Sequence, residues 1–381
     1  MRRRNKTMNQ TTETVRLGAL ISTSQKKILK QKMKLDKRYS FLAALAAEAS
    51  ESPNLTLYFF SPEDVDVTSG DIHKALYWDR ENNKWYECSA PSPEVVYERI
   101  YVKNELVDRV RTFFSDNNVP FINARANFNK LICHQKLSED VKTSPYLPPA
   151  IEVRKIEDIH RFLKVHDVIY LKKVISSLGK GVIKLEKTAE NSIKYSYYKS
   201  RLRTQTVKSI YDLKPVLHRF FHNKTYIAQR GIPLIKIGDQ SIDFRAEVQR
   251  GKNGIIISGV CARAGLKNSP ITVHSTAMPY ELFLKEHLHY SEQNIKNTVL
   301  KVEEFLTTIY SSLEDAYGPF GEIGIDFGID TNRDIWFIEA NSKSAKVSFE
   351  KSYGDAGLRE NAFHLLEYAE SLHQKEPAQE G

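Results

Sequence analysis

The chain has 381 residues, of which 41% are hydrophobic, and this length predicts two or three domains with well-filled cores. Its net charge of +9 allows attraction to nucleic acid, to an anionic surface or to a polyanionic small ligand, and charge alone does not decide among them. The sequence has no apolar run near the roughly 20 residues of a membrane span, and its three cysteines, far apart and outside any CxxC spacing, indicate a reducing, cytoplasmic setting rather than a disulfide framework.

The N-terminal third predicts a basic tail followed by a small α/β domain. Residues 1–14 are charged and lack the apolar stretch that follows the basic residues of a secretory signal, so we expect a disordered tail. Residues 15–125 alternate strand-like and helix-like patterns, beginning with an apolar strand pattern at Val15. This order is typical of an α/β domain with a parallel sheet.

A lysine-dense stretch follows the first predicted strand. Lys26, Lys30 and Lys34 recur every four residues and would line one face of a helix. Such a face either contacts solvent or forms a patch for nucleic acid or a membrane surface. We favour the solvated face, because no aromatic residues interleave with the lysines for base stacking.

The segment after residue 125 contains a loop suited to phosphate. Strand patterns at 168–174 and 182–185 flank the glycine-containing residues 175–181. Backbone N–H groups of such a loop can approach phosphate oxygens, and Lys180 adds positive charge. The loop lacks the GxxxxGK[ST] spacing of a P-loop. An ordinary hairpin loop explains this pattern, taken alone, equally well.

Two later strand patterns each carry an arginine. On the first, Asp243, Arg245 and Glu247 share one face because side chains alternate along a strand. Arg263 lies on the second strand pattern. A polar sheet face of this kind either contacts water or lines a cleft for anions, since guanidinium binds phosphate and carboxylate in bidentate fashion.

Residues 321–344 predict a hairpin with oxygen donors on one face. Two apolar-alternating runs are separated by the turn sequence Asp-Thr-Asn-Arg-Asp at 330–334. Glu339 and Asn341 point the same way, and a turn centred in this sequence places Asp326 opposite Glu339. Two carboxylates and an amide suit Mg²⁺, which prefers one or two carboxylates plus substrate phosphates, so the cluster predicts a nucleotide site. The alternative is a solvated hairpin with polar ends.

The order of these features resembles the ATP-grasp superfamily, and the local sequence most resembles the YheC/YheD endospore coat-associated group of Bacillus-type bacteria. The likeness spans about residues 126–350, and a further likeness at residues 93–100 extends it into the N-terminal domain. The stretches that carry it are Phe128-Asn129-Lys130, Tyr146-Leu147-Pro148, Tyr170-Leu171-Lys172, Ser177-Leu178-Gly179-Lys180-Gly181, Gln229-Arg230-Gly231-Ile232-Pro233-Leu234, Asp243-Phe244-Arg245, Ala262-Arg263 and Trp336-Phe337-Ile338-Glu339-Ala340-Asn341.

The resemblance implies a fold and a set of site residues. We expect a mixed α+β and α/β chain: an ATP-grasp domain of two α+β lobes around a nucleotide cleft over residues 126–373, preceded by the small α/β domain and followed by a polar tail at 374–381. The residues implied to bind the nucleotide are Lys130, Lys172, Ser176, Ser177, Gly179, Lys180, Gly181, Gln229, Ile232 and Asp243. The implied metal ligands are Asp326, Glu339 and Asn341, and the implied catalytic residues are Arg245, Arg263 and Lys172.

The resemblance also implies a reaction. ATP and Mg²⁺, or Mn²⁺ in its place, would convert a carboxylate into an acyl phosphate that an amine attacks, with both substrates unidentified and with a link to the spore coat or envelope. Phosphoryl transfer depends on positioning and charge neutralisation, so lysines, arginines and a metal around one cleft suffice. The alternative is an ATP-binding fold kept as a non-catalytic, spore-associated scaffold, and nucleic-acid binding ranks third.

The chain departs from the group's pattern beside the implied ligands. Lys173 stands where proline is usual, and Val174-Ile175-Ser176 replaces a more glycine-rich approach to the loop. Ser344 stands where proline is usual after the metal-binding asparagine. Because the implied ligands themselves are present, we expect nucleotide binding more firmly than turnover.

Overall fold

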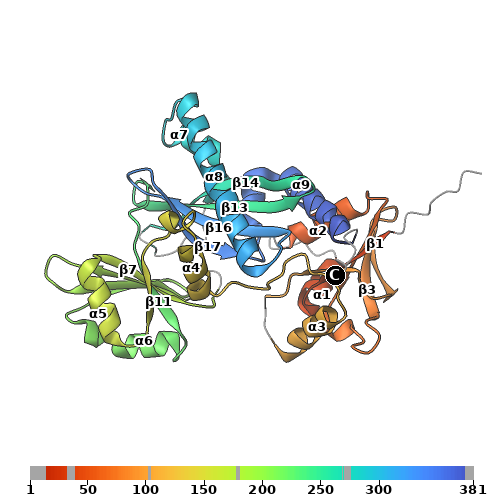
Figure 1. The fold of residues 1–381 in the computed structure, drawn as a ribbon, viewed down its shortest axis with the longest axis horizontal. Helices are drawn as coiled ribbons and strands as arrows, with labels where there is room; N and C mark the ends of the chain where they lie inside the picture. Colours follow the sequence, from red (N-terminus) through yellow and green to blue (C-terminus); the bar gives the residue numbers. More distant parts are fainter. Residues whose placement is uncertain are drawn as a thin grey trace, which may run out of the picture. The chain divides into compact units, whose positions relative to one another are not determined.

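The structure, a computed structural model, describes residues 14–31, 39–101, 104–176, 181–267, 269 and 276–373. The chain divides into two units (Figure 1). The first takes in the described parts of residues 1–122, 251–253 and 359–381, and the second comprises 123–250 and 254–358. The domain ranges expected from the sequence stay a prediction.

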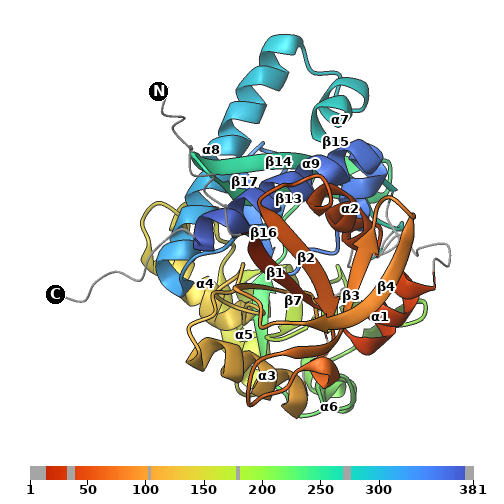
Figure 2. The same cartoon turned by 90° about the vertical axis from the view of Figure 1, so that its right-hand side faces the viewer.

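The first unit is built on a five-stranded sheet with the order β4-β3-β2-β1-β5, in which β1 is parallel to both β2 and β5 (Figure 2). Adjacent residues of β2 face opposite cores: Phe59 packs with Leu42 of α2, and Phe60 packs with Phe114 of α3. Helices therefore cover both faces, as the alternating strand and helix patterns predict. The elements are β1 (Val15–Leu20), α1 (Thr23–Lys30), α2 (Ser40–Ala49), β2 (Leu55–Phe60), η1 (Pro62–Asp64), β3 (Ile72–Asp79), β4 (Lys84–Ala90), β5 (Val95–Glu98) and α3 (Glu105–Asp116).

The second unit begins with a six-stranded antiparallel sheet with the order β10-β9-β8-β7-β11-β6, which we call the first lobe. Ile169 and Leu171 of β7 face the buried core beneath α5 and α6, so the alternating residue Lys172 lies on the opposite face. The elements are α4 (Lys130–Glu139), η2 (Ser144–Tyr146), β6 (Ala150–Val153), α5 (Ile156–Val165), β7 (Val168–Lys173), β8 (Val182–Lys187), β9 (Ile193–Tyr198), β10 (Leu202–Val207), η3 (Ile210–Leu213), α6 (Lys214–Phe221) and β11 (Tyr226–Arg230).

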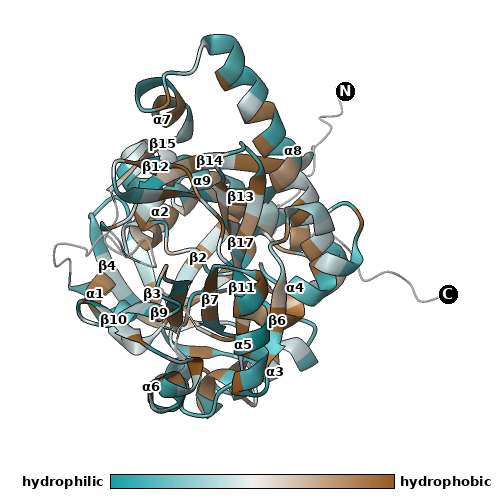
Figure 3. Cartoon of the chain, turned by 90° about the vertical axis from the view of Figure 1, so that its left-hand side faces the viewer, coloured by the Kyte–Doolittle hydropathy of each residue, from teal (hydrophilic) through white to brown (hydrophobic). Residues whose placement is uncertain are grey.

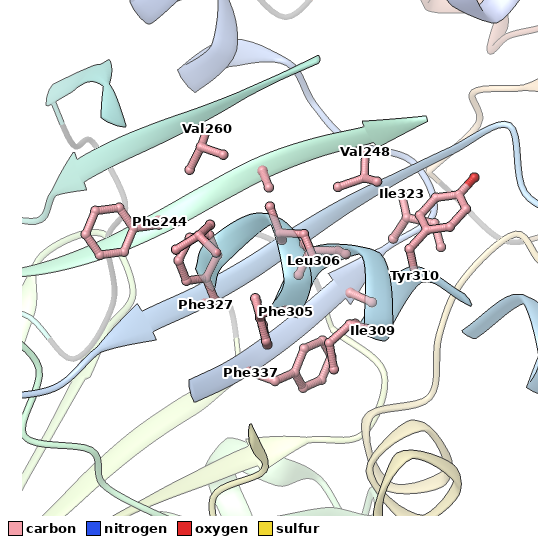
Figure 4. Close-up of a cluster of buried hydrophobic side chains, with 14 of the residues drawn as sticks. Phe244, Val248, Val260, Phe305, Leu306, Ile309, Tyr310, Ile323, Phe327 and Phe337 are labelled. Atoms are coloured by element: carbon pink, nitrogen blue, oxygen red, sulfur yellow. The ribbon is translucent and has the colours of Figure 1, made fainter. Parts of the chain in front are cut away.

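The second lobe of this unit is a sheet with the order β15-β14-β13-β16-β17, with β12 paired to β13. Its apolar face packs on α8: the Phe327 ring of β16 lies 5.2 Å from that of Phe244 and 5.4 Å from that of Phe305 (Figure 4). The polar residues that alternate with this core share the other face. The elements are β12 (Lys236–Ile237), β13 (Gln240–Gly251), β14 (Gly254–Ala264), β15 (Thr276–Pro279), α7 (Tyr280–Glu286), α8 (Glu292–Tyr317), β16 (Glu322–Ile329), β17 (Ile335–Asn341) and α9 (Val347–His373).

Helix α9 belongs to both units. Gly354 adopts φ 64°, outside the helical region, and separates the helix into two segments. From Arg359 onward the helix groups with the first unit, where the Arg359 guanidinium pairs with Glu48 and Glu51. The sequence-based domain range assigned the whole of this helix to the second unit.

One local expectation is wrong. The predicted solvated lysine face is interrupted at Lys26, whose side chain is buried and whose ammonium lies 2.7 Å from the Asp64 carboxylate; Lys34 lies outside the described residues. Helix α6 begins directly after η3, and Pro215 lies in its first turn. Proline is tolerated there because the first backbone N–H groups of a helix have no partner within it. Among the described residues, no helix is long and apolar enough to cross a membrane.

Candidate functional site

Three adjacent strands of the second lobe, β13, β16 and β17, bring Arg245 and the expected metal-binding side chains into one row. The β16–β17 register pairs Asp326 with Glu339, as the position of the turn predicts, and pairs Gly324 with Asn341. The β13–β16 register pairs Arg245 with Asp326. Directly opposed side chains on one sheet face lie close enough to interact. The hairpin therefore places its carboxylates beside an arginine from a third strand.

Two arginines hold the Asp326 carboxylate. Arg245 donates from Nη2 to Asp326 Oδ2 at 2.7 Å and from Nε to Oδ1, and Arg263 Nη2 lies 2.9 Å from the same Oδ1. Arg263 also donates to both oxygens of Asp243, at 2.7 and 2.9 Å. Burial alone would raise the pKa of Asp326, but the two guanidiniums outweigh it and hold the pKa below its ordinary value. Asp326 is therefore a carboxylate at neutral pH.

The other two implied metal ligands lie next to this pair. The Asn341 amide, in the orientation that satisfies both its polar atoms, accepts from Arg245 Nη2 and donates to Glu339 Oε1, each at 3.2 Å. Glu339 Oε1 also accepts from Lys130 Nζ at 3.0 Å. Lys130 donates as well to the backbone oxygen of Ser176, at 3.1 Å. Lys130 therefore joins the first residues of the glycine loop to the hairpin carboxylates.

Lys172 and Gln229 lie on the open face of the first lobe. The Lys172 ammonium donates to the Gln229 side-chain oxygen. Burial, opposed by the charge of Glu339 and reinforced by the nearby cation Lys130, lowers the pKa of Lys172 to about 8. An anionic ligand beside this amine would restore its charge. Lys172 thus has the properties of a phosphate-binding lysine: it is largely buried, and its partner is a neutral amide oxygen.

A small cavity connects the two halves of the site. It measures about 20 Å³ and is lined by residues of both lobes, among them Lys130, Lys172, Gln229, Phe337 and Glu339. That volume holds about one water molecule. An adenine ring can enter only if the cavity walls move apart.

A buried ion cluster is linked to Arg245 through the Ser344 hydroxyl. The Lys346 ammonium lies 2.7 Å from Glu247 and 2.8 Å from Glu322, with all three side chains about 1% exposed. The Ser344 hydroxyl donates to Glu247 and accepts from Arg245 Nη1 at 3.1 Å. Ser344 therefore links the buried cluster to the arginine that holds Asp326.

Gly324 is required by this arrangement. A Cβ atom at position 324 would lie 2.9 Å from both Cβ and Oγ of Ser344 and 3.2 Å from Arg245 Nη1. The first two distances are shorter than van der Waals contacts allow. Glycine therefore leaves the space that Ser344 and Arg245 occupy together.

Sequence reasoning missed most of the buried cluster. It placed Glu247 on the polar face of β13 but assigned no role to Glu322 or Lys346, and it treated Ser344 only as a departure from the family pattern. Lys346 lies outside any strand, so no local signal connects it to Glu322. The available hint was strand alternation, which places Glu322 on the same face of β16 as Asp326.

The glycine loop is described only at its ends. Ser177, Gly179 and Lys180 lie outside the described residues. At one end lies Ser176, and at the other the Gly181 carbonyl accepts from the backbone N–H of Lys173 at 3.0 Å. Their expected roles stay predictions.

The segment expected at the adenine edge follows β11. Ile232 is half-buried there, and its carbonyl accepts from the backbone N–H of Leu234 at 2.9 Å. A Cβ atom at Gly231 would lie 2.6 Å from Val168 Cγ1, so glycine lets this segment pass close to β7. The role of Ile232 in nucleotide binding also stays a prediction.

The donor atoms fit one kind of metal ion. Within the described ranges, no group of three or more His, Cys, Asp or Glu side chains is arranged to hold a metal. Asp326, Glu339 and Asn341 supply two carboxylates and one amide oxygen. This set is too small for an all-protein metal site and suits Mg²⁺, which takes its remaining oxygens from water and substrate phosphate.

Comparison with known proteins identifies relatives over the segment that carries this site. A family model described as YheC/D like ATP-grasp matches residues 118–372. The chain is 27% identical over 339 residues to the endospore coat-associated protein YheD of Bacillus subtilis (strain 168), covering 84% of this chain and 71% of the relative. It is 22% identical over 318 residues to the endospore coat-associated protein YheC of the same strain, covering 79% and 84%.

Solved structures show the same fold. The VanG D-Ala:D-Ser ligase from Enterococcus faecalis superimposes with a TM-score of 0.56, covering 95% of this chain and 100% of the ligase. The two sequences are 11% identical. This likeness extends over both units of the chain but concerns the fold alone.

Proposed function

The chain belongs to the YheC/D like ATP-grasp family, as its sequence predicts, and we propose that it binds ATP with Mg²⁺ and uses the ATP to join a carboxylate to an amine. One observation carries this proposal: four cations, Lys130, Lys172, Arg245 and Arg263, converge with the carboxylate and amide oxygens of the β16–β17 hairpin. Such a cluster neutralises phosphate and metal charge together.

The two lysines are the proposed contacts for the ATP phosphates. Lys130 is held between the Ser176 carbonyl and Glu339, so it is already oriented toward the loop and the hairpin. Lys172 has only the neutral Gln229 oxygen as a hydrogen-bond partner among the described residues. Replacing that partner with phosphate oxygens would compensate its burial. The adenine ring would then occupy the widened cavity beside Gln229 and Ile232.

Asp326, Glu339 and Asn341 would hold Mg²⁺, or Mn²⁺ in its place. When bound, the ion would neutralise negative charge on the phosphate oxygens. In the structure, Lys130 pairs with Glu339, while Arg245 and Arg263 pair with Asp326 and hold the pKa of Asp326 below its ordinary value. Asp243, held by Arg263, would fix the arginine rather than contact the metal.

The proposed reaction has two steps. A carboxylate oxygen of the acceptor attacks the γ-phosphorus of ATP, forming a P–O bond as the bond to ADP breaks. An amine then attacks the acyl carbon, a C–N bond forms, inorganic phosphate leaves and the amine loses a proton. Arg245 and Arg263 would steady the transferred phosphoryl group or the acceptor carboxylate, because guanidinium pairs with both groups in bidentate fashion.

Acyl-phosphate trapping tests this reaction. Protein, ATP and Mg²⁺ are incubated with pools of amino acids and short peptides plus hydroxylamine, and hydroxamate and phosphate are measured. We expect both products from wild type and from Lys301→Met, an exposed site on α8, and roughly 100-fold less from Lys130→Met because a charge contact to the phosphates is lost. Wild-type protein that binds ATP but forms no product with any pool would contradict the ligase proposal.

A second candidate function is a spore coat-associated scaffold that binds ATP without turnover. Two observations favour it: the relatives YheD and YheC carry endospore coat-associated names, and the loop approach Val174-Ile175-Ser176 lacks glycine. The scaffold predicts ATP binding with no product in the trapping experiment. It also predicts that components of the spore coat or envelope, rather than a carboxylate and an amine, are the partners.

A further inference from the structure

The positive charge of the chain is concentrated in the first lobe. Residues 150–230, which run from β6 to β11, contain eighteen Lys and Arg against seven Asp and Glu, a net charge of +11. The whole chain carries +9, so the remaining residues together are slightly acidic. A charge so localised creates a field over one part of the surface and favours contact with an anionic partner.

A group of these cations without an ion pair lies at one end of the sheet. We call this surface the basic edge, defined by the exposed residues Lys199, Arg201, Arg203, Lys208, Lys214 and Arg219. Ion pairs neutralise the lysines of β8, the next strand beyond β9: Lys184 pairs with Glu186, and Lys187 pairs with Asp167. Among the residues that the structure describes, no carboxylate pairs with any member of the basic edge.

Asp212 is the single acidic residue in the sequence from 199 to 219, and its carboxylate accepts from the backbone N–H of Ser209 at the start of η3. The rest of this stretch provides cations without counterions. Because the cations extend from the β9–β10 turn to α6, the field covers the whole length of β10.

Strand β10 is an edge strand. It pairs antiparallel with β9, from Leu202 opposite Tyr198 to Val207 opposite Ile193, and it ends the six-stranded sheet (Figure 3). The residues from Arg203 to Thr206 are exposed. An edge strand presents a row of backbone N–H and C=O groups that can pair with another chain. Charges of one sign on such an edge repel a second copy of the same strand but attract an acidic one.

Contacts with Phe220 connect α6 to strands β9 and β7 of the sheet. Arg203 lies opposite Tyr197, whose ring packs against Phe220 of α6 with centroids 5.3 Å apart. The Lys173 ammonium lies 5.4 Å from the centre of the Phe220 ring. Burial and then the charge of Lys224 lower the pKa of Lys173, which is consistent with a locally positive potential.

The basic edge is distinct from the proposed nucleotide site. Lys172 and Lys173 are adjacent on β7, so their side chains leave opposite faces of the sheet. Lys172 contacts Gln229 on the open face, whereas Lys173 contacts Phe220 on the face covered by α6. An anion bound on the α6 side would not compete with ATP.

We propose that β10 docks an acidic, extended polypeptide segment, which adds to the sheet as the next strand and places carboxylates beside the basic edge. Strand addition gives affinity through main-chain hydrogen bonds and specificity through alternating side chains. We favour a polypeptide over a nucleic acid, because the edge position of β10 offers main-chain groups that can pair with another strand, and only a polypeptide supplies one.

The test uses a labelled twelve-residue peptide that alternates glutamate with threonine, measured by fluorescence anisotropy on the full chain. The comparison ligands are the same peptide with glutamine for glutamate and a labelled twelve-nucleotide oligothymidylate. The variant Arg203→Glu/Lys208→Glu reverses two charges of the basic edge. The matched control Lys296→Glu/Lys301→Glu reverses two exposed charges on α8 and changes the net charge equally.

We expect the acidic peptide to bind to wild type and the glutamine peptide to bind at least roughly tenfold more weakly. The basic-edge variant should bind the acidic peptide roughly tenfold more weakly than wild type, and the control variant should stay within about twofold of wild type. Hydrogen exchange of residues 202–207 should slow when the acidic peptide binds. The proposal is overturned if both variants weaken binding equally, if the exchange of β10 is unchanged, or if the oligothymidylate binds as tightly as the peptide. None of these outcomes depends on ATP binding or turnover.

Discussion

Removing the Lys346 ammonium should destabilise the second unit strongly and in a pH-dependent way. Lys346→Met keeps most of the apolar stem and takes away the charge that faces Glu247 and Glu322. Because these three side chains are about 1% exposed, the variant leaves two carboxylates close together without water or a cation. Breaking a buried pair in this way costs about 3–5 kcal/mol, a large part of the roughly 5–15 kcal/mol of a typical domain.

The pH dependence follows from proton binding. In wild type, burial lowers the pKa of Lys346, but the two carboxylates outweigh it and raise the pKa above its ordinary value. The stabilisation is therefore fully present below the unfolded pKa and is lost only at strongly alkaline pH. In the variant, one buried carboxyl group acquires a raised pKa. The folded state then binds an extra proton, and stability rises by about 1.4 kcal/mol for each pH unit of acidification until the unfolded pKa is reached.

Urea unfolding at pH 6 and pH 8 tests this prediction. Trp336 is one of three tryptophans, and it becomes the single reporter in a Trp78→Phe/Trp85→Phe background. We expect the variant to lose about 3–5 kcal/mol of unfolding free energy at pH 8. At pH 6 this loss should be smaller by up to about 3 kcal/mol. The exposed control Lys301→Met should change stability by less than about 0.5 kcal/mol. A loss below about 1 kcal/mol at pH 8, or an equal loss at both pH values, would refute the reasoning.

Three further predictions concern the same site. The affinity for ATP should fall as pH rises from 7 to 9, because burial lowers the pKa of Lys172 to about 8 and phosphate favours the charged form of this amine. Calorimetry in buffers of different ionisation enthalpy should show that ATP binding takes up protons. Lys172→Arg should abolish both the pH dependence and the proton uptake. Gly324→Ala should lose about 1–3 kcal/mol in urea unfolding because its Cβ would meet Ser344 at 2.9 Å; an unchanged midpoint would argue against that close contact. Ser344→Ala should cost about 1–3 kcal/mol by leaving Glu247 and Arg245 without the hydroxyl, and unaltered Mg²⁺-dependent ATP binding in this variant would contradict its link to the site.

The hairpin could be predicted from the sequence because its signals are local. The turn residues at 330–334 fixed the register, and strand alternation then placed Asp326 opposite Glu339, which the structure confirms. The same alternation placed Asp243, Arg245 and Glu247 on one face. Both arguments use only neighbouring residues and the period of a strand.

The long-range ion pairs could not be predicted in this way. Arg245 and Asp326 are 81 positions apart, and Lys346 and Glu247 are 99 apart, so their meeting depends on which strands become neighbours. Lysine and glutamate are also among the residues most often exposed, so the sequence alone favoured solvent-exposed side chains at these positions. The same reasoning failed at Lys26, where a periodic lysine pattern gave no sign of a buried carboxylate partner.

The proposed ATP and metal site is tested most directly by calorimetric titration of ATP with and without Mg²⁺. The variant Asp326→Asn/Glu339→Gln removes both carboxylate charges, and Asp315→Asn/Glu303→Gln makes the same chemical change at exposed positions of α8. Glu339→Gln alone serves if the first variant is unstable, since Glu339 is only partly buried. We predict that Mg²⁺ strengthens ATP binding to wild type and to the control, and that the site variants lose this metal-dependent part. No ATP binding to folded wild-type protein, or an equal effect of Mg²⁺ on the site variants, would contradict the account.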